Sequence, residues 1–335
     1  MDRALAPDAE PHGGVVDLRP EPGQSQENFF RIKIGRMRKL EALGLARPLG
    51  PTRWSLSENA EEVLRELGER NDIIKRIHRG LTEKGWERGA SDFVLHGESE
   101  PTPVIGRLVA RGLDDELKGS AYVVIDGVNG RAHHIKLPHL DATGDSAPGP
   151  IVELRRFEDA AGRSQLAIAV RSDLAIDIQV AAQGATWLDR QLVAKEPIAL
   201  SEGGFGAEVR EAMIARIDHH VEEGLARRQR QRVIFARDLF DALRRCELKA
   251  AAARLAAETG LACQPASGGE HVAGIYRQRV TLASGRFAMI DTGLGFSLVP
   301  WSPSLEHQLG KQVSGIAMPG GNVDWSFGRK RGLGI

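Results

Sequence analysis

The chain has 335 residues, enough for about two or three domains, and 41% hydrophobic with 27% charged residues is the composition of a soluble globular protein. Its 45 basic residues balance its 45 acidic residues, so the net charge gives no indication of nucleic-acid binding. Only local clusters of basic residues could indicate it. With two cysteines, no long apolar run and no signal-peptide order, the sequence predicts a cytoplasmic protein without disulfides or membrane insertion.

Residues 1–97 are expected to form a winged-helix-like domain. By composition, residues 1–28 are a proline-rich acidic lead. Gly44 ends a helix predicted over residues 29–43, in which Phe29, Ile32, Arg36, Leu40 and Leu43 recur at helical spacing. A Pro-Leu-Gly-Pro turn then separates strands at 45–46 and 53–56. A basic helix followed at once by a hairpin is typical of the end of a winged helix.

The same segment contains the most basic window of the chain. Between Phe29 and Trp54 it has one acid, Glu41, and a set of basic residues, Arg31, Lys33, Arg36, Arg38, Lys39, Arg47 and Arg53. Such clustering suits the neutralisation of DNA phosphates by a helix that enters the major groove. The alternative is a solvated face in a winged helix that binds only protein, because neither base-reading residues nor half-site symmetry are visible.

A second helix is expected from a cap at Ser57, with one buried face formed by Val63, Leu64, Leu67, Ile73, Ile74, Ile77 and Leu81. The proline-containing stretch 98–103 is interpreted as a domain boundary. Residues 98–180 then follow a period of two, with turn signals at Asp126-Gly127 and Asn129-Gly130 and strands predicted over 104–110, 121–125, 132–137, 151–157 and 166–170. This pattern predicts a small β-barrel of the OB or SH3-like kind.

Histidines in this region suggest a metal site that the strand pattern argues against. His133, His134 and His139 lie in the segment AHHIKLPHLD. A metal site built from a histidine triad needs three imidazoles on one ion, but His133 and His134 point to opposite faces if the stretch is a strand. We therefore expect no metal, no cofactor and no catalytic residue here.

Residues 181–245 are expected to be a helical connector, with helices around Trp187 and over residues 205–226. His219 and Glu223 have metal-ligand spacing, but the lack of a third ligand favours a solvated pair. A second basic run follows, with Arg227, Arg228, Arg230 and Arg232 as candidate DNA contacts. Acids interleaved further along the chain indicate that part of the basic character is used in internal ion pairs.

Residues 246–335 are expected to form a C-terminal α+β domain, which makes the whole chain a multidomain α+β protein. An alanine-rich helix over 248–259 ends at Gly260, and strands are predicted over 272–282, 287–290 and 296–299. A short helix would begin at Ser302-Pro303, and late strands are expected at 312–313 and 323–325. The basic residues Arg329, Lys330 and Arg331 are further candidate DNA contacts, with a solubilising tail as the alternative.

Long gapless motifs run through all these regions, namely LGERNDIIKRIHRGL, GLDDELKGSAYVVIDG, GLARRQRQRVIFARDLFDALRRCEL, GRFAMIDTGLGFSLVPW and VDWSFGRKRGLGI. Together they resemble the region that follows the nuclease in bacterial mobilisation relaxases of the type IV secretion and Ti-plasmid border-nuclease type. Those proteins nick plasmid DNA and lead it through the secretion channel. The resemblance covers nearly the whole chain and implies the back half of a relaxase without its nuclease.

The resemblance also implies local features. Met1 would lie inside a helix of the longer proteins, and a strand is implied at Val15 to Leu18. Arg230 stands where a glycine is common in these relaxases, an exchange expected to add charge and to favour an extended helix.

The resemblance and the basic windows predict a non-catalytic DNA-binding and relaxosome module that acts in plasmid or mobile-element transfer. The alternative is a protein-interaction module that docks the transfer complex to a type IV secretion coupling protein, which predicts weak or absent DNA binding. An enzyme with an unrecognised site ranks last. Neither Tyr122 nor Tyr276 stands in a relaxase tyrosine motif, and the sequence has no P-loop, dinucleotide loop, nucleophile elbow or HExxH pattern.

Overall fold

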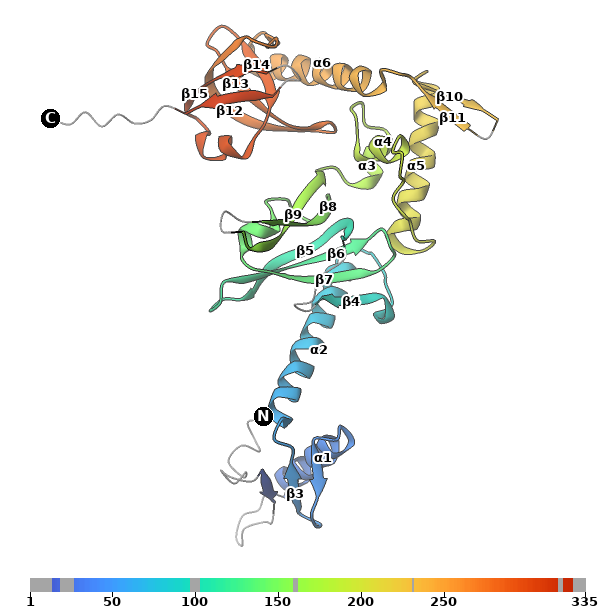
Figure 1. The fold of residues 1–335 in the computed structure, drawn as a ribbon, viewed down its shortest axis with the longest axis vertical. Coiled ribbons are helices and arrows are strands. Elements are labelled where there is room, and N and C mark those ends of the chain that lie inside the picture. Colours follow the sequence, from blue (N-terminus) through green and yellow to red (C-terminus); the bar gives the residue numbers. More distant parts are fainter. Residues whose placement is uncertain are drawn as a thin grey trace, which may run out of the picture. The chain divides into compact units, whose positions relative to one another are not determined.

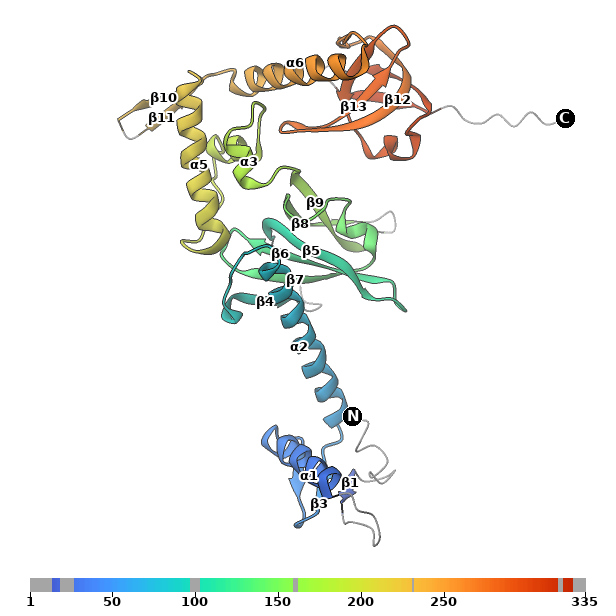
Figure 2. The same ribbon diagram turned by 180° about the vertical axis from the view of Figure 1, so that it is seen from behind.

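The computed structural model describes residues 14–18, 27–96, 103–158, 162–230, 232–318 and 322–327, with side chains of the first helix described from Phe30 onward. It confirms an α+β protein with several sheets. The chain divides into two compact units, residues 1–79 and 80–335, whose elements are labelled in Figures 1 and 2. Among the described helices, none has the length and apolar character needed to cross a membrane.

The first unit combines a small sheet with a helix. Strands β1 (Val15–Asp17), β2 (Ala46–Pro48) and β3 (Arg53–Leu56) pair antiparallel in the order β1-β3-β2, and α1 (Glu27–Ala42) lies between β1 and β2 in the chain. Gly44 follows α1 with φ +73°, a conformation that suits glycine at the end of a helix. The predicted helix, the hairpin and the strand near Val15 are confirmed.

The buried face of α1 coincides only in part with the residues that recur at helical spacing in the sequence. Met37 and Leu40 are buried, with Phe30 and Ile34 packed against the same core, whereas Ile32 is 53% exposed. The four buried or partly buried side chains recur every three or four residues and are all apolar. Packing them against β1 and β3 therefore removes more apolar surface from water than burying a face that contains an arginine would.

The second helix, α2 (Ala60–Thr82), runs without interruption past Gly68. The Ser57 hydroxyl does not cap it, since it donates to the Leu45 carbonyl at 3.0 Å and so fastens the loop after α1 to the end of the hairpin. Leu67 is 41% exposed, while Ile77 and Leu81 are buried. The predicted buried face is therefore confirmed except at Leu67, since Val63, Leu64, Ile73 and Ile74 are half-buried.

The second unit begins with a six-stranded sheet whose order is β4-β7-β6-β5-β8-β9. The strands are β4 (Phe93–His96), β5 (Ile105–Asp115), β6 (Ser120–Gly127), β7 (Ala132–Leu137), β8 (Ile151–Glu158) and β9 (Ser164–Ser172). Apolar residues of period two, among them Leu108, Ile125 and Ile135, form its core. The predicted strands of this region are confirmed. Asp126-Gly127 is not a turn, because both residues continue β6 and the chain reverses over the residues that follow.

Strand β4 joins this sheet from outside the region expected to form it. It pairs parallel with β7, so residues 93–96, expected in the first domain, add a strand to the sheet of the second unit. The described pairing leaves β4 and β9 as the two ends of the sheet, and closure into a barrel stays a prediction. Short 3-10 turns η2 (Ala90–Asp92) and η3 (Leu140–Thr143) flank β4 and β7.

A helical segment follows, with α3 (Ile176–Val180), α4 (Trp187–Leu192), α5 (Gly204–Glu222) and α6 (Leu239–Thr259). Between α5 and α6 the chain forms a hairpin of β10 (Ala226–Gln229) and β11 (Arg232–Phe235). The expectation of a helix extended through Arg230 was therefore wrong. Gly224, at φ +73°, ends α5 before the arginine run. The β-branched residues Val233 and Ile234 favour a strand in β11, which pairs with the arginine run. Helix α6 is continuous through residues 245 and 246, where a boundary was expected.

The last part of the unit is a five-stranded antiparallel sheet in the order β14-β13-β12-β15-β16. Its strands are β12 (His271–Leu282), β13 (Gly285–Asp291), β14 (Phe296–Pro300), β15 (Gln312–Ala317) and β16 (Val323–Ser326), with the 3-10 turn η4 (Pro303–Gln308) after β14. Leu255 of α6 packs against Val280, Phe287 and Phe296 on one face of the sheet. The predicted strands and the short helix with proline at its start are confirmed.

Candidate functional site

Basic side chains cover the outward side of α1. Because successive residues turn by about 100° around a helix, these side chains point away from Met37 and the core behind it. Lys33, by contrast, is half-buried on the inner side. We define the α1 basic face as the four exposed residues Arg31, Arg36, Arg38 and Lys39.

Arg53 is the remaining candidate of the first unit. It lies on β3, and its guanidinium is 3.7 Å from the Asp17 carboxylate on the neighbouring strand β1. Both groups are partly exposed to solvent, so the pair is weak, but it compensates part of the Arg53 charge. Arg53 is therefore a weaker candidate for phosphate contact than the α1 basic face.

The hairpin after α5 carries the second candidate group. Arg227, Arg228, Arg230 and Arg232 are all exposed. Arg228 forms an ion pair with Asp218 of α5, so its charge is compensated. We define the hairpin arginines as Arg227, Arg230 and Arg232, and within the described residues no carboxylate pairs with any of them.

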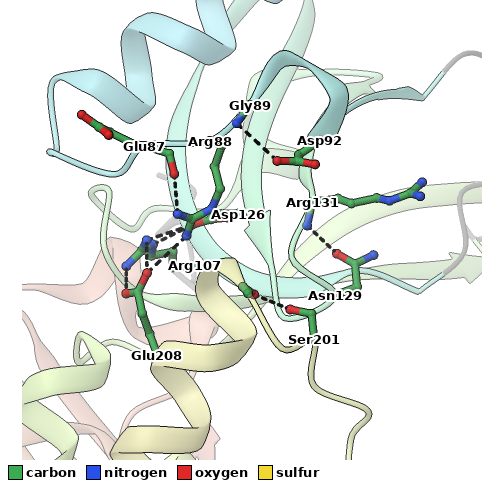
Figure 3. Close-up of polar contacts among 11 residues, drawn as sticks. Glu87, Arg88, Gly89, Asp92, Arg107, Asp126, Asn129, Arg131, Ser201 and Glu208 are labelled. Atoms are coloured by element: carbon green, nitrogen blue, oxygen red, sulfur yellow. Dashed lines mark hydrogen bonds and ion pairs between the residues drawn. The ribbon is translucent and has the colours of Figure 1, made fainter.

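Helix α5, which carries the hairpin, is held at its first turns by an ionic cluster shown in Figure 3, in which Arg107 and Asp126 are buried and Glu208 is 40% exposed. Arg107 donates to the Asp126 carboxylate at 2.8 Å and to Glu208 of α5 at 2.6 Å. Arg88, from the segment after α2, donates to the same two carboxylates at 2.7 and 3.2 Å. The cluster thus ties three separate parts of the second unit, namely the segment after α2, the sheet and α5.

The environment of this cluster is largely apolar. The Arg107 guanidinium lies 3.7 Å from the Trp86 ring centre and 4.7 Å from that of Phe205. Burial raises the pKa of the Asp126 carboxyl, although Arg107 and Arg88 favour its charged form. Burial alone would lower the pKa of Arg88, but Asp126 and Glu208 more than offset it and the pKa is raised. Arg88 and Arg107 are bonded to carboxylates inside the protein and are therefore poor candidates for phosphate contact.

The second half of α5 is held by another buried group. Asp189 of α4 accepts hydrogen bonds from Arg216 at 2.8 and 2.9 Å and from His220 at 2.6 Å, and all three side chains are inaccessible to solvent. Arg216 also donates to the carbonyls of Val180, Ala182 and Gly184. Burial opposes the charge on Asp189, but the hydrogen bonds from His220 and Arg216 hold its pKa well below the usual range.

The histidines of β7 are also buried, and each stacks on a different ring. His133 stacks on His96 of β4, with Nε2 of His96 2.7 Å from Nδ1 of His133, and His134 stacks on Tyr122. Burial lowers the pKa of His133 to about 4, with smaller contributions from His96 and Arg131. Within the described residues, no group of three or more potential ligands is arranged to hold a metal ion.

Several structurally decisive residues escaped the sequence interpretation, among them Arg88, Arg107, Asp126, Asp189, Arg216 and Glu208. A signal for one pair was present. Arg107 and Asp126 face each other across β5 and β6, on the side of the sheet opposite to that of their neighbours Leu108 and Ile125. Charged residues of opposite sign at buried positions indicate a pair, but the contribution of α5 depends on tertiary packing. The candidates Arg329, Lys330 and Arg331 lie outside the described residues.

Comparison with known proteins adds one finding. The family described as "Protein of unknown function (DUF3363)" matches residues 33–165 and 153–334. The chain belongs to this family. No curated protein and no solved structure matches it.

Proposed function

We propose that the chain is a non-catalytic DNA-binding module of a relaxosome, the back half of a conjugative mobilisation relaxase that acts in plasmid or mobile-element transfer. The observation that carries the proposal is the α1 basic face, a group of exposed cations on a helix that is followed directly by the β2–β3 hairpin. A winged-helix-like interpretation of this unit would place the same helix at a DNA groove. The resemblance of the sequence motifs to those of relaxases supplies the biological context.

Two further features support the proposal. The hairpin arginines form a second group of exposed cations, and in the described part of the chain no carboxylate pairs with these three arginines. An OB-like interpretation of the six-stranded sheet fits a protein that handles nucleic acid, because small barrels of this kind often bind it. Phosphate contacts by such groups predict affinity that falls steeply with salt.

The proposal is tested by titrating labelled duplex and single-stranded oligonucleotides with the full chain at several salt concentrations. The test variant replaces Arg31, Arg36, Arg38 and Lys39 with glutamine. We expect it to bind much more weakly and to reduce the slope of log K against log salt by up to about 3.6, because each duplex phosphate that a cation neutralises contributes about 0.9 to that slope.

A matched control replaces the exposed residues Arg65, Arg70, Lys75 and Arg79 of α2 with glutamine. The control removes the same charge, but its residues alternate along the helix with acids such as Glu66, Glu69 and Asp72. We therefore expect little change in affinity or slope. Equal losses in both variants would indicate a general effect of net charge, and no binding by the parent chain at low salt would refute the DNA-binding function.

One observation favours a protein-interaction module as the second candidate. Ile32, 53% exposed, lies on the same outward side of α1 as the basic residues, and Leu49 in the β2–β3 hairpin is also 53% exposed. Exposed apolar side chains among cations suit a protein surface. If the parent chain shows no DNA affinity but is retained by a type IV secretion coupling protein, and exchange of Ile32 for serine abolishes retention, this second function is supported.

A further inference from the structure

Arg230 has a backbone conformation that its residue type disfavours. Its φ is +55°, and no other non-glycine residue among those described has a positive φ. In this left-handed region the Cβ atom of an L-residue crowds the following carbonyl, whereas glycine has no such penalty. The stability of the hairpin alone therefore favours glycine at this position. The presence of an arginine instead suggests that its side chain has a function other than stabilising the turn.

The two faces of the hairpin are chemically different. Residues directly opposite each other in an antiparallel pair share a face, so Arg228 with Val233 forms one face and Gln229 with Arg232 the other. Arg228 is paired with Asp218 and so marks the face turned to α5. Arg227 lies on the outer face with Gln229 and Arg232, about 7–8 Å diagonally from Arg232. The outer face and the start of the turn therefore present the uncompensated hairpin arginines.

The hairpin has a firm base. Ala226 is buried, and the Ala236 amide donates to the Leu225 carbonyl at 2.9 Å. The rings of Phe235 and His220 pack edge to face, with their centres 6.2 Å apart. His220 in turn belongs to the buried Asp189 group that holds α5. In both ribbon views the hairpin projects from the end of α5 (Figures 1 and 2). The cations are thus presented on a narrow element that is fixed to the protein at one end.

We infer that the β10–β11 hairpin is a ribbon that binds duplex DNA, with the hairpin arginines on its phosphates and with Arg230 retained for this contact at the expense of hairpin stability. A two-stranded ribbon fits the major groove, which is about 12 Å wide. Uncompensated arginines on its outer face complement the phosphate charge. This inference rests on the proposed DNA-binding function and identifies a second contact, separate from the α1 basic face.

The test separates charge from backbone strain at one residue. Arg230→Gly removes both, Arg230→Gln removes only the charge, and Arg230→Lys keeps the charge. Duplex affinity would be measured by fluorescence anisotropy on the full chain over a series of salt concentrations, and thermal stability by calorimetry without DNA.

We expect Arg230→Gly to raise the Tm of the second unit by about 1–3 °C while weakening duplex binding roughly 3- to 10-fold and reducing the salt slope by about 1. Arg230→Gln should weaken binding equally without raising Tm. Arg230→Lys should retain the salt slope of the parent. A combination of higher stability and weaker binding in the same variant is the result that a purely structural role of Arg230 does not produce.

The outcomes distinguish this inference from the proposed function. If Arg230→Gly and Arg230→Gln bind duplex DNA like the parent while the variant of the α1 basic face does not, the ribbon inference is overturned and the DNA-binding function stands. If the parent itself does not bind duplex DNA, both fail. If Arg230→Gly lowers Tm, the argument from backbone strain is wrong.

Discussion

The arginines on α1 and those around α5 have the same chemistry and opposite environments. On α1 the side chains are exposed, whereas Arg107 and Arg216 are 4% and 0% exposed and bonded to carboxylates. A buried guanidinium is stable only where carboxylates and carbonyls replace its hydration, so it cannot also bind phosphate. The density of basic residues in a sequence therefore does not identify a binding surface, because some of these cations are buried in ion pairs inside the protein.

The largest effect that would test this comparison is expected at Asp189. Asp189→Asn removes the charge that compensates Arg216, which has no access to solvent. Leaving a buried guanidinium uncompensated costs about 3–5 kcal/mol of unfolding free energy. Urea denaturation followed by circular dichroism would show a correspondingly lower midpoint.

The matched control is Asp218→Asn, the same exchange in an ion pair between α5 and the hairpin. Asp218 and Arg228 are both about half exposed, so we expect a loss below about 1 kcal/mol. Equal losses in the two variants would remove the distinction between buried and exposed pairs on which the comparison rests.

An intermediate effect is expected from pH. The folded-state pKa of His133 is lowered to about 4 from 6.5, so between these values the unfolded chain binds more protons than the folded one. The contribution of neutral His133 to the unfolding free energy is therefore complete above about pH 6.5 and is lost as the pH falls toward 4. The loss between pH 6.5 and 4.5 should be about 2 kcal/mol.

The measurement is the unfolding free energy of parent and His133→Gln at several pH values in this range. The exchange removes the titrating ring, so the variant should have a flatter pH dependence, whatever its absolute stability. A parent whose stability does not change over this window would show that His133 accepts a proton without unfolding.

The smallest effect on stability is expected on the α1 basic face. The glutamine variant of Arg31, Arg36, Arg38 and Lys39 leaves the apolar face of α1 intact, so each exchange should change the unfolding free energy by less than about 0.5 kcal/mol. Thermal unfolding of parent and variant would check this. A large loss would mean that these residues support the fold, and their effect on DNA binding could then not be assigned to phosphate contact.

Local patterns in the sequence were enough for most of the elements. Helix α1, the hairpin after it, the strands of the six-stranded sheet and those of the C-terminal sheet follow from apolar periodicity and from glycine and proline at their ends. The predictions were wrong where the same sequence pattern is compatible with two local structures. Asp126-Gly127 has the composition of a turn, but Asp126 continues a strand because Arg107 and Arg88 compensate its burial. The arginine run after α5 is a hairpin because β11 supplies a partner strand.

The sequence by itself determined the α+β class, the order of the elements and the residues with enough positive charge to meet phosphate. These properties depend on local periodicity and composition, which do not require knowledge of distant partners. Only the tertiary structure decided which arginines are buried in ion pairs, that Glu208 and Arg107 meet across 101 residues of chain, and that Arg230 has a left-handed backbone at the start of a turn. Pairing and burial depend on contacts between residues far apart in the chain, and no local pattern contains that information.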